Sequence, residues 1–273
     1  AVSFSEMAKA VNVPVWEEAV PKVRYHVFQE MVQTVWEILK SRNITPEDAQ
    51  EPEIKADFEC YAFDAEFIKN LSPFPGVYIM KDRDGDVVYI GKSKCLRQRV
   101  SSYFADTRRL DEKKRRIRNC VYDIEIRETG NELTALLLEQ ELIQEFSPVI
   151  NQQFQLKERR GRQRERYSRM IILPGVDGAV NIYGLNPGHA VLSFTGHPDH
   201  KSFMTGIKKF VREFFESGPR EDRREELICS WLTKNRDQAH SIDMRCISHP
   251  GQVIRLLEEH ARSVLSGEPV IHI

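Results

Sequence analysis

Cysteine is scarce in this chain, and it never occurs in the close pairs that hold a structural zinc ion. The odd number and wide scatter of the cysteines argue against a disulfide framework and favour a reducing cytoplasm, which is where we expect the protein. The 273 residues contain five cysteines, which are Cys60, Cys95, Cys120, Cys229 and Cys246.

Long apolar runs are also missing. No segment approaches the roughly 20 apolar residues that span a bilayer, and no basic head precedes an apolar core. We therefore expect neither a membrane protein nor a secreted one. The hydrophobic share of 41% and the charged share of 30% are typical of a globular protein. The net charge of -1 hides an asymmetry, because residues 1–75 are acidic and residues 76–169 are rich in Lys and Arg.

The hydrophobic pattern divides the chain into four parts. Apolar residues between positions 20 and 38 recur at helical spacing, so we expect a helical N-terminal segment over residues 1–70. A small α+β unit over 71–156 and a basic linker over 157–169 follow. The remainder, 170–273, is predicted to be a C-terminal α+β region, and the sequence leaves its role open.

The unit over 71–156 contains three runs with the composition of β-strands. "GVYIMK" and "DVVYIG" flank the turn residues Asp84 and Gly85, which predicts a hairpin, and "CVYDIEIRET" is a third strand. "KCLRQRVSSYF", "RLDEKKRRIRN" and "ELTALLLEQELIQEF" predict helices, the last of them capped by Asn131 or Thr129. Hairpin, helices, third strand and further helix together make a small α+β unit.

The C-terminal region alternates between the two periods. "RMIILPG", "AVNIYG" and "AVLSFTG" predict three strands, whereas "KSFMTGIKKFVREFFESG", "REELICSWLTKN" and "GQVIRLLEEHARSVLSG" predict three helices. The stretch before it, "LKERRGRQRERYSR", carries seven cations against two acids. It has no apolar period, so we expect a flexible strap that orders on a polyanion.

Tyrosines and cations are interleaved between Pro75 and Phe104. Tyr78 and Tyr89 fall in the two hairpin strands, where we expect them to face each other. Gly91 follows closely, and its missing side chain allows a neighbouring group to approach the backbone.

Further polar groups follow the hairpin. Lys92, Arg99 and Tyr103 are expected to project from the start and one side of the next helix. A phenol beside fixed cations ionises more easily, so a tyrosine here could serve as a general base. Glu139 lies among leucines of a later helix, which indicates either a solvated edge or a carboxylate held buried for a purpose.

These residues resemble the GIY-YIG nuclease family, and positions 75–151 are similar to its UvrC-type domain. The resemblance is carried by "GVY", by "YIGKSKCLRQRVSSYF" and by "ELTALLLEQELIQEFSPVIN". It implies a three-stranded antiparallel sheet flanked by helices, and a metal-dependent endonuclease that cuts DNA in repair or recombination.

The family's site can be carried over by position. Glu139 matches the single ligand of one Mg²⁺ or Mn²⁺ ion. Tyr89, or Tyr78 in the alternative assignment, would take a proton from the attacking water. Lys92 and Arg99 would stabilise the transition state and keep that tyrosine acidic. The catalytic residues that the resemblance implies are Tyr78, Tyr89, Lys92, Arg99, Tyr103 and Asn151.

Other cations are expected to bind DNA phosphates without reading sequence. They lie after the second strand, in the helix that begins near Lys113, and in the basic linker. The predicted nucleic-acid-binding residues are Lys94, Arg97, Lys113, Lys114, Arg115, Arg116, Arg159, Arg160, Arg162 and Arg164.

The chain also departs from UvrC. The acidic continuation that follows the asparagine in UvrC is replaced by "QQFQLKERRGRQRERY", and nothing after it resembles the second nuclease domain of UvrC. We therefore expect a protein other than a full-length UvrC. Two alternatives stay open, a nucleic-acid-binding module with lost or weak cleavage and a partner-recruiting protein that uses its N-terminal helices or C-terminal region.

Overall fold

The computed structural model describes residues 56–105, 110–153, 167–220, 222–247 and 249–266. The chain divides into two compact units, Ala1–Glu53 and Ile54–Ile273, and every described residue belongs to the second. The expected N-terminal helices and most of the basic linker lie outside the described residues, and the predicted domain boundaries stay predictions.

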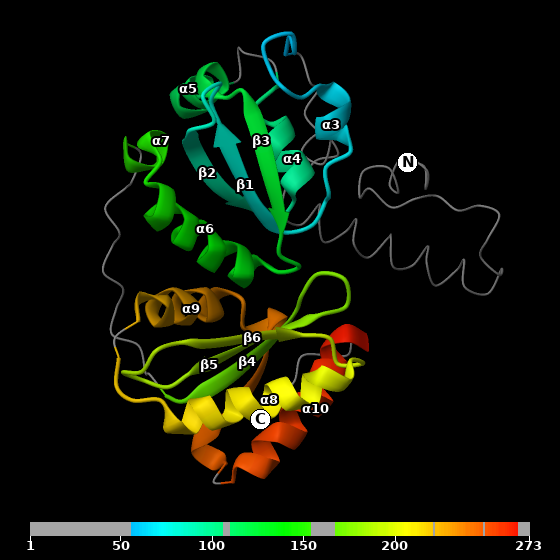
Figure 1. Cartoon of the computed structure of the whole chain (residues 1–273), viewed down its shortest axis with the longest axis vertical. Helices are drawn as coiled ribbons and strands as arrows, with labels where there is room; N and C mark the ends of the chain where they lie inside the picture. The colour runs from blue at the N-terminus through cyan, green and yellow to red at the C-terminus, as the bar shows by residue number, and fades with distance from the viewer. Residues whose placement is uncertain (1–55, 106–109, 154–166, 221, 248, 267–273) are drawn as a thin grey trace, which may run out of the picture. The chain divides into compact units, whose positions relative to one another are not determined.

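The first sheet has three antiparallel strands in the order β2-β1-β3 (Figure 1). β1 (Gly76–Lys81) and β2 (Val87–Ser93) form the predicted hairpin, and β3 (Asp123–Glu128) pairs with the other side of β1. Gly85 in the hairpin turn has φ +87°, a value that glycine adopts without strain. β2 is therefore an edge strand, with one row of backbone groups facing away from the sheet.

The two faces of this sheet pack against different helices. Residues of even number on β1, with Tyr89 on β2, pack against α3 (Ala65–Lys69), α4 (Leu96–Ser101) and α5 (Glu112–Cys120). The opposite face of the sheet packs against α6 (Glu132–Phe146). Alternate side chains of a strand point to opposite faces, which explains the division.

Helix α6 begins and ends where its sequence predicts. The Asn131 side chain caps its start by accepting a hydrogen bond from the Thr134 N–H, so Asn131 rather than Thr129 is the cap. Ser147 ends the helix in the left-handed region at φ 47°, one residue before Pro148. The short helix α7 (Val149–Gln153) follows.

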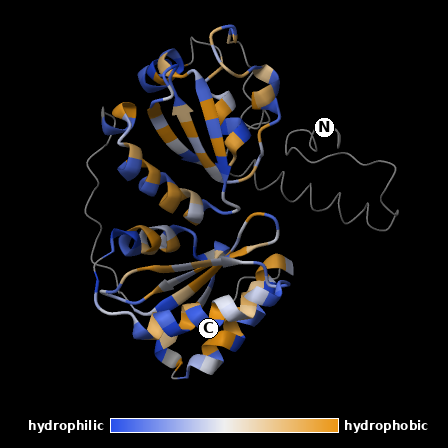
Figure 2. Cartoon of the chain, viewed as in Figure 1, coloured by the Kyte–Doolittle hydropathy of each residue, from blue (hydrophilic) through white to orange (hydrophobic). Residues whose placement is uncertain are grey.

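The second sheet has four antiparallel strands in the order β6-β5-β4-β7. Its elements are β4 (Arg169–Pro174), β5 (Val180–Leu185), β6 (Leu192–Gly196), α8 (Lys201–Glu216), α9 (Arg223–Lys234), β7 (His240–Asp243) and α10 (Pro250–Ser266). One face packs against α8 and α10, and the other against α9. Figure 2 shows apolar residues recurring along the strands of both sheets.

The α+β fold class is confirmed, as are three of the four strands and all three helices predicted for the C-terminal region. β7 escaped prediction because "HSID" is only four residues long and has no marked apolar alternation. Among the described helices, none is long and apolar enough to cross a membrane.

Two buried histidines lie side by side between β7 and α10. The Nδ1 atoms of His240 and His260 are 3.3 Å apart, and the residues are 4% and 2% exposed. Burial lowers the pKa of His260, although the charge of Glu259 opposes the shift. Histidine in an unfolded chain takes up its proton near pH 6.5, so below that pH the unfolded state binds more protons than the folded state.

We therefore expect the free energy of unfolding to fall as the pH is lowered from about 6.5 toward the depressed pKa of His260. Thermal unfolding measured across this pH range should show that the wild type loses stability as the pH falls. The stability of His260→Gln should depend less steeply on pH. His200→Gln, which replaces an exposed histidine, is the control and should follow the wild type. Equal slopes in all three proteins would contradict the assignment.

Candidate active site

The open edge of β2 is covered by two side chains from the helices that follow β3. The Asn151 amide lies in α7 and forms two hydrogen bonds of 2.8 Å with Ile90, accepting from its N–H and donating to its carbonyl. The Lys92 N–H, two residues along the same edge, donates to Oε1 of Glu139 at 2.9 Å. Asn151 thus holds the backbone between Tyr89 and Gly91 in place.

Glu139 reaches this edge from α6, on the opposite face of the sheet from the tyrosines. Burial raises the pKa of the Glu139 carboxyl, while the positive charges of Lys92, Lys113 and Arg99 lower it. The Glu139 side chain is half-buried, and so lies between the two alternatives that the sequence leaves open, a solvated edge and full burial. Four cationic or donor groups from β2, α4 and α5 act on it.

Three tyrosines form one cluster on the other face. The ring centroids of Tyr78, Tyr89 and Tyr103 are 5.8 to 6.4 Å apart. The hydroxyls of Tyr78 and Tyr103 share a hydrogen bond of 2.8 Å, and Nε of Arg99 donates to the Tyr78 hydroxyl at 3.3 Å. The predicted phenols and guanidinium therefore meet at one place.

The hairpin register differs from the expected one. Tyr78 lies opposite Gly91, and Tyr89 lies opposite Met80, so the two tyrosines are diagonal neighbours rather than a facing pair. A Cβ at Gly91 would overlap the Tyr78 phenol, so this glycine is the position over which the phenol lies. The close approach expected at Gly91 is confirmed, and its occupant is Tyr78.

The expectation that the cations keep the base tyrosine acidic is wrong for Tyr89. Burial raises the pKa of Tyr89, with a further rise from Tyr78, and the nearby Lys113 ammonium only partly opposes it. Burial also raises the pKa of Tyr103, far above its ordinary value, and Arg99 offsets little of this. Desolvation outweighs the attraction of the cations, because a phenolate loses more solvation than these charges restore.

Arg99 stays charged in this surrounding. Burial alone would lower its pKa, but the phenols of Tyr78 and Tyr103 raise the pKa above its ordinary value. The guanidinium also lies over the Tyr103 ring, 5.6 Å from its centroid. A fixed, permanently charged fork beside a carboxylate suits the recognition of phosphate oxygens.

The positions of Lys92 and of the first two lysines of α5 differ from those expected from the sequence. Lys92 belongs to β2 and not to the start of the next helix, because the strand continues to Ser93. The Nζ atoms of Lys113 and Lys114 lie 4.9 Å and 5.8 Å from the ring centroids of Tyr89 and Tyr103. Lys113 therefore belongs to the site itself rather than only to its DNA-binding surroundings.

Several other cations that were predicted to bind DNA form contacts with protein groups instead. Lys94 forms a 2.6 Å ion pair with Glu132, and Nε of Arg97 donates to the Leu71 carbonyl at 2.8 Å. Arg115 donates to the Leu110 carbonyl at 3.3 Å, whereas Arg116 is exposed on the same helix. The predicted linker residues Arg159, Arg160, Arg162 and Arg164 lie outside the described residues.

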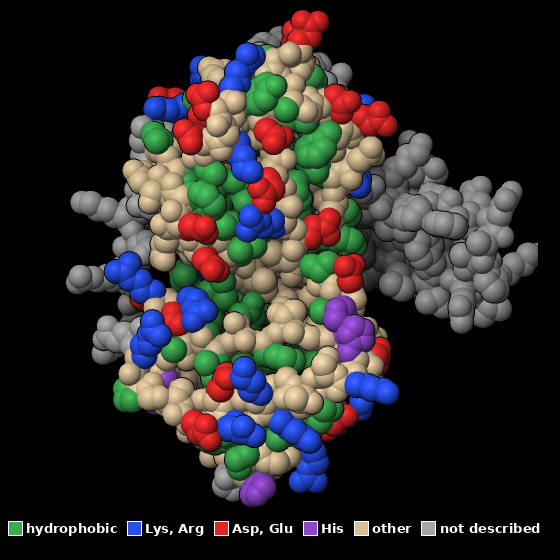
Figure 3. Space-filling model, in the orientation of Figure 1, with side chains coloured by type: hydrophobic (Ala, Val, Ile, Leu, Met, Phe, Trp, Pro, Cys, Tyr) green, Lys and Arg blue, Asp and Glu red, His purple; other side chains and the backbone are tan. Residues whose placement is uncertain are grey.

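Surface charge adds little to this picture. Figure 3 shows acidic and basic side chains interspersed over the face in view. Charge alone therefore does not mark a path for nucleic acid there, and the site is better located by the cluster around Glu139.

Sequence reasoning missed the part played by Lys113 and Glu132. Glu132 lies seven residues before Glu139 and so on the same side of α6, where its pairing draws Lys94 toward the helix. A helical wheel of α6 could have indicated Glu132. No local signal separates Lys113 from the three cations that follow it, because only the packing of α5 decides which one reaches Tyr89.

Comparison with known proteins agrees with the geometry. Residues 74–152 match a family model described as a UvrC-like GIY-YIG domain. UvrABC system protein C of Dichelobacter nodosus is 46% identical over 92 residues, covering 33% of this chain and 15% of that protein. The protein of the same name from Carboxydothermus hydrogenoformans is 45% identical over 86 residues, covering 32% and 14%. The match thus spans about a seventh of the length of these relatives.

Among solved structures, the chain is similar to the GIY-YIG N-terminal endonuclease domain of UvrC from Thermotoga maritima, bound to magnesium as its catalytic divalent cation. The identity is 36% and the TM-score 0.29, and the match covers 32% of this chain and 92% of that one. The family model falls on the residues that build the site around β2 and α6. Residues 74–152 of this chain are therefore similar to a UvrC-like GIY-YIG domain.

Proposed function

We propose that this chain is a metal-dependent DNA endonuclease, which hydrolyses phosphodiester bonds at the site around Glu139 and acts in DNA repair or recombination. One observation carries the proposal. A half-buried carboxylate, Glu139, is bonded to the Lys92 N–H at the edge of β2 and is acted on by the charges of Lys113 and Arg99. These two cations in turn lie over the rings of Tyr89 and Tyr103. The UvrC relatives support DNA as the substrate.

The residues divide the chemistry between them. Arg99 and Lys113 stabilise negative charge on the scissile phosphate. We take Tyr89 as the general base because its side chain keeps 5% exposure, whereas the Tyr78 side chain is fully buried. The Tyr78 hydroxyl is also bonded to both Tyr103 and Arg99. Tyr78 stays the alternative. Asn151 and Gly91 orient the backbone that carries Tyr89.

The donor set fits a hard divalent cation such as Mg²⁺ or Mn²⁺. Mg²⁺ is commonly held by one or two carboxylates while its other ligands are waters and substrate phosphates. Among the described residues no group of three metal-binding side chains occurs, and the Glu139 carboxylate accepts the Lys92 hydrogen bond at Oε1. Its other oxygen can bind one ion, which when present would polarise the scissile phosphate.

The substrate can be identified with a set of DNA structures. Purified protein should be incubated with supercoiled, nicked, flapped and branched DNA, each with Mg²⁺, with Mn²⁺ and without metal. Cleavage of one structure in preference to the others would name the substrate. Tight binding to DNA without cleavage of any of them would favour a binding module instead.

The cations of α5 should separate into two kinds. We expect Arg116→Ala to weaken binding of all DNA about equally and to reduce the slope of log affinity against log salt by about one unit. Its rate at saturating DNA should stay unchanged, because Arg116 is exposed and outside the cluster. Lys113→Ala should instead lower that rate, because Lys113 lies against Tyr89 and acts on Glu139. Equal effects of the two variants on both quantities would contradict the division.

A further inference from the structure

Helix α6, which carries Glu139, has two buried faces. Ala135 and Leu142 pack against the three-stranded sheet. Leu133, with Leu136 and Leu137, packs into the apolar cluster of β4, β5 and α9. With 3.6 residues per turn these two sets project on opposite sides, so α6 is covered on two opposite faces. Figure 1 shows α6 between the first sheet and α9.

Polar contacts fasten the start of α6 to the second sheet. The Nδ2 atom of Asn131 donates to the Pro174 carbonyl at 2.7 Å, while its Oδ1 caps the helix. The Thr134 hydroxyl and the Tyr183 hydroxyl share a hydrogen bond of 2.7 Å, and Tyr183, on β5, is only 6% exposed. The Asn131 side chain and the buried hydroxyl pair thus attach the start of α6 to the second sheet.

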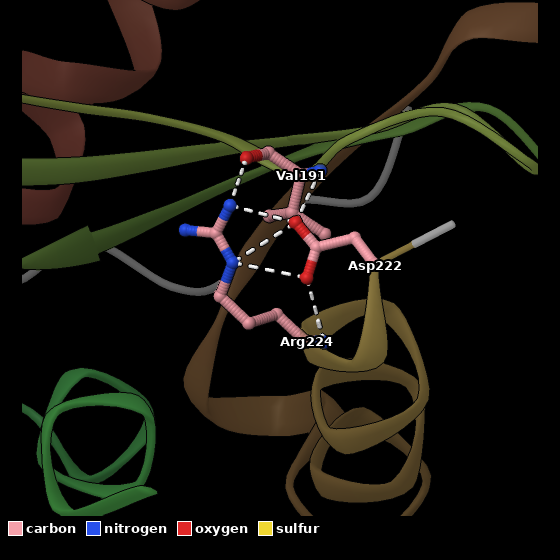
Figure 4. A network of polar contacts seen from close by, with 3 residues as sticks. All are labelled: Val191, Asp222 and Arg224. Carbon is pink, nitrogen blue, oxygen red and sulfur yellow. Dashed lines mark hydrogen bonds and ion pairs between the residues drawn. The ribbon is translucent and has the colours of Figure 1, made fainter. Parts of the chain in front are cut away.

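A network of hydrogen bonds at the start of α9 stabilises the surface that packs against α6. The carboxylate of Asp222 accepts hydrogen bonds from the backbone N–H groups of Val191 and Arg224 (Figure 4). The Arg224 guanidinium donates to the same carboxylate and to the Val191 carbonyl. The hydrogen bonds that Arg224 donates to Asp222 raise the pKa of Arg224, and the charge of Glu141 on α6 adds to the rise. The network holds α9 to the strand segment before β6.

We propose that the C-terminal region, residues 170–273, provides a packing surface that sets the position of α6. Within it, Tyr183, acting through Thr134, is a positioning residue for Glu139. The proposal rests on the metal-binding role proposed above for Glu139. Thr134 lies five residues before Glu139 in the same helix. A shift of α6 against the C-terminal region would move the Glu139 carboxylate relative to the Lys92 N–H. The position at which the carboxylate can bind the cation would move with it.

Binding of Mn²⁺ in the absence of DNA tests this role without relying on cleavage. Free Mn²⁺ measured by electron paramagnetic resonance gives the dissociation constant. We expect Tyr183→Phe and Thr134→Val each to weaken Mn²⁺ binding about fivefold, the order set by one buried hydrogen bond. The double variant should be no weaker than either single one, because both remove the same bond. Thr134→Ser keeps a hydroxyl and should bind nearly as the wild type does.

A matched control is available in the same sheet. The Thr195 hydroxyl donates to Asn181 at 2.7 Å on β6 and β5, where the bond does not involve α6. Thr195→Val removes a bond of the same length and should leave Mn²⁺ binding unchanged. If Tyr183→Phe bound Mn²⁺ as tightly as Thr195→Val does, the positioning role would be overturned. A wild type that bound no Mn²⁺ would overturn it as well.

The outcome is separable from that of the proposed function. A wild type that binds Mn²⁺, loses affinity in Tyr183→Phe and cuts none of the DNA structures would refute the nuclease and leave the positioning role standing.

Docking of the two halves can be tested in the full chain. A protease site inserted between residues 154 and 166 and cleaved after folding should yield two fragments that co-elute in gel filtration, because the α6 face binds them together. Two soluble fragments that elute separately would contradict the proposal that the C-terminal region holds α6 in place.

Discussion

Replacing Glu139 with glutamine should abolish DNA cleavage and leave DNA binding within a few fold of the wild type. The amide oxygen of glutamine can still accept the Lys92 N–H, so the edge of β2 keeps its cover. The amide lacks the negative charge that holds a divalent cation, and this loss removes the chemistry. Cleavage and binding should be measured on the same duplex, at saturating enzyme and by titration respectively.

Glu145→Gln is the matched control for that variant. Glu145 lies on the same helix and is exposed, so the substitution changes the charge of α6 equally without touching the cluster. We expect it to cut at the wild-type rate. Normal turnover by Glu139→Gln would remove Glu139 from the site, and an equal loss in both variants would point to the charge of the helix as a whole.

Arg99→Ala should lower the rate at saturating DNA by about a hundredfold or more, the usual order for losing one donor that stabilises transition-state charge. The substitution removes the guanidinium that donates to the Tyr78 hydroxyl and acts on Glu139. Arg99→Lys should restore little, because a point charge cannot copy a planar fork. Single-turnover rates of the three proteins decide the matter.

Arg116→Ala serves as the cationic control for Arg99, since it removes an exposed guanidinium outside the cluster. Its single-turnover rate should equal that of the wild type. Full activity in Arg99→Lys would show that position 99 needs only a positive charge, and the specific contact with phosphate would then be wrong.

Part of the site could be predicted because Tyr78, Tyr89 and Arg99 lie close together in sequence. The roles of Glu139 and Asn151 came from the resemblance to the GIY-YIG family. The hairpin places Tyr78 and Tyr89 on one face by the two-residue period of strands, and the structure brings both to Tyr103 and Arg99. The register could not be predicted, because a hairpin of the same sequence pattern can pair Tyr78 with Tyr89 or with Gly91. Only the turn and the bulge between Met80 and Lys81 decide this.

Electrostatic expectations failed where burial decides. Sequence shows which charges are near a phenol along the chain, but it does not show how much water the phenol loses. Tyr89 and Tyr103 illustrate this, since their pKa values rise although cations surround them. The same holds for Lys94 and Arg97, whose pairing with Glu132 and Leu71 depends on packing between distant segments.

The arrangement of the C-terminal half was open for a related reason. The apolar residues of α6 lie on two sides of the helix, and the side of Ala135 and Leu142 packs against the hairpin sheet. Nothing in the pattern of residues 170–273 says that β5 and α9 cover the other side. That contact joins residues as distant as Thr134 and Tyr183, which periodicity cannot connect.

Nicking of supercoiled plasmid by the wild-type protein tests the central claim most directly, namely that the cluster around Glu139 is a metal-dependent nuclease site. The protein, in excess over plasmid, should be incubated with Mg²⁺ and in parallel with EDTA, with Glu139→Gln treated in the same way. We expect conversion to nicked or linear plasmid only for the wild type with Mg²⁺. Equal conversion in EDTA, or by Glu139→Gln, would contradict the account.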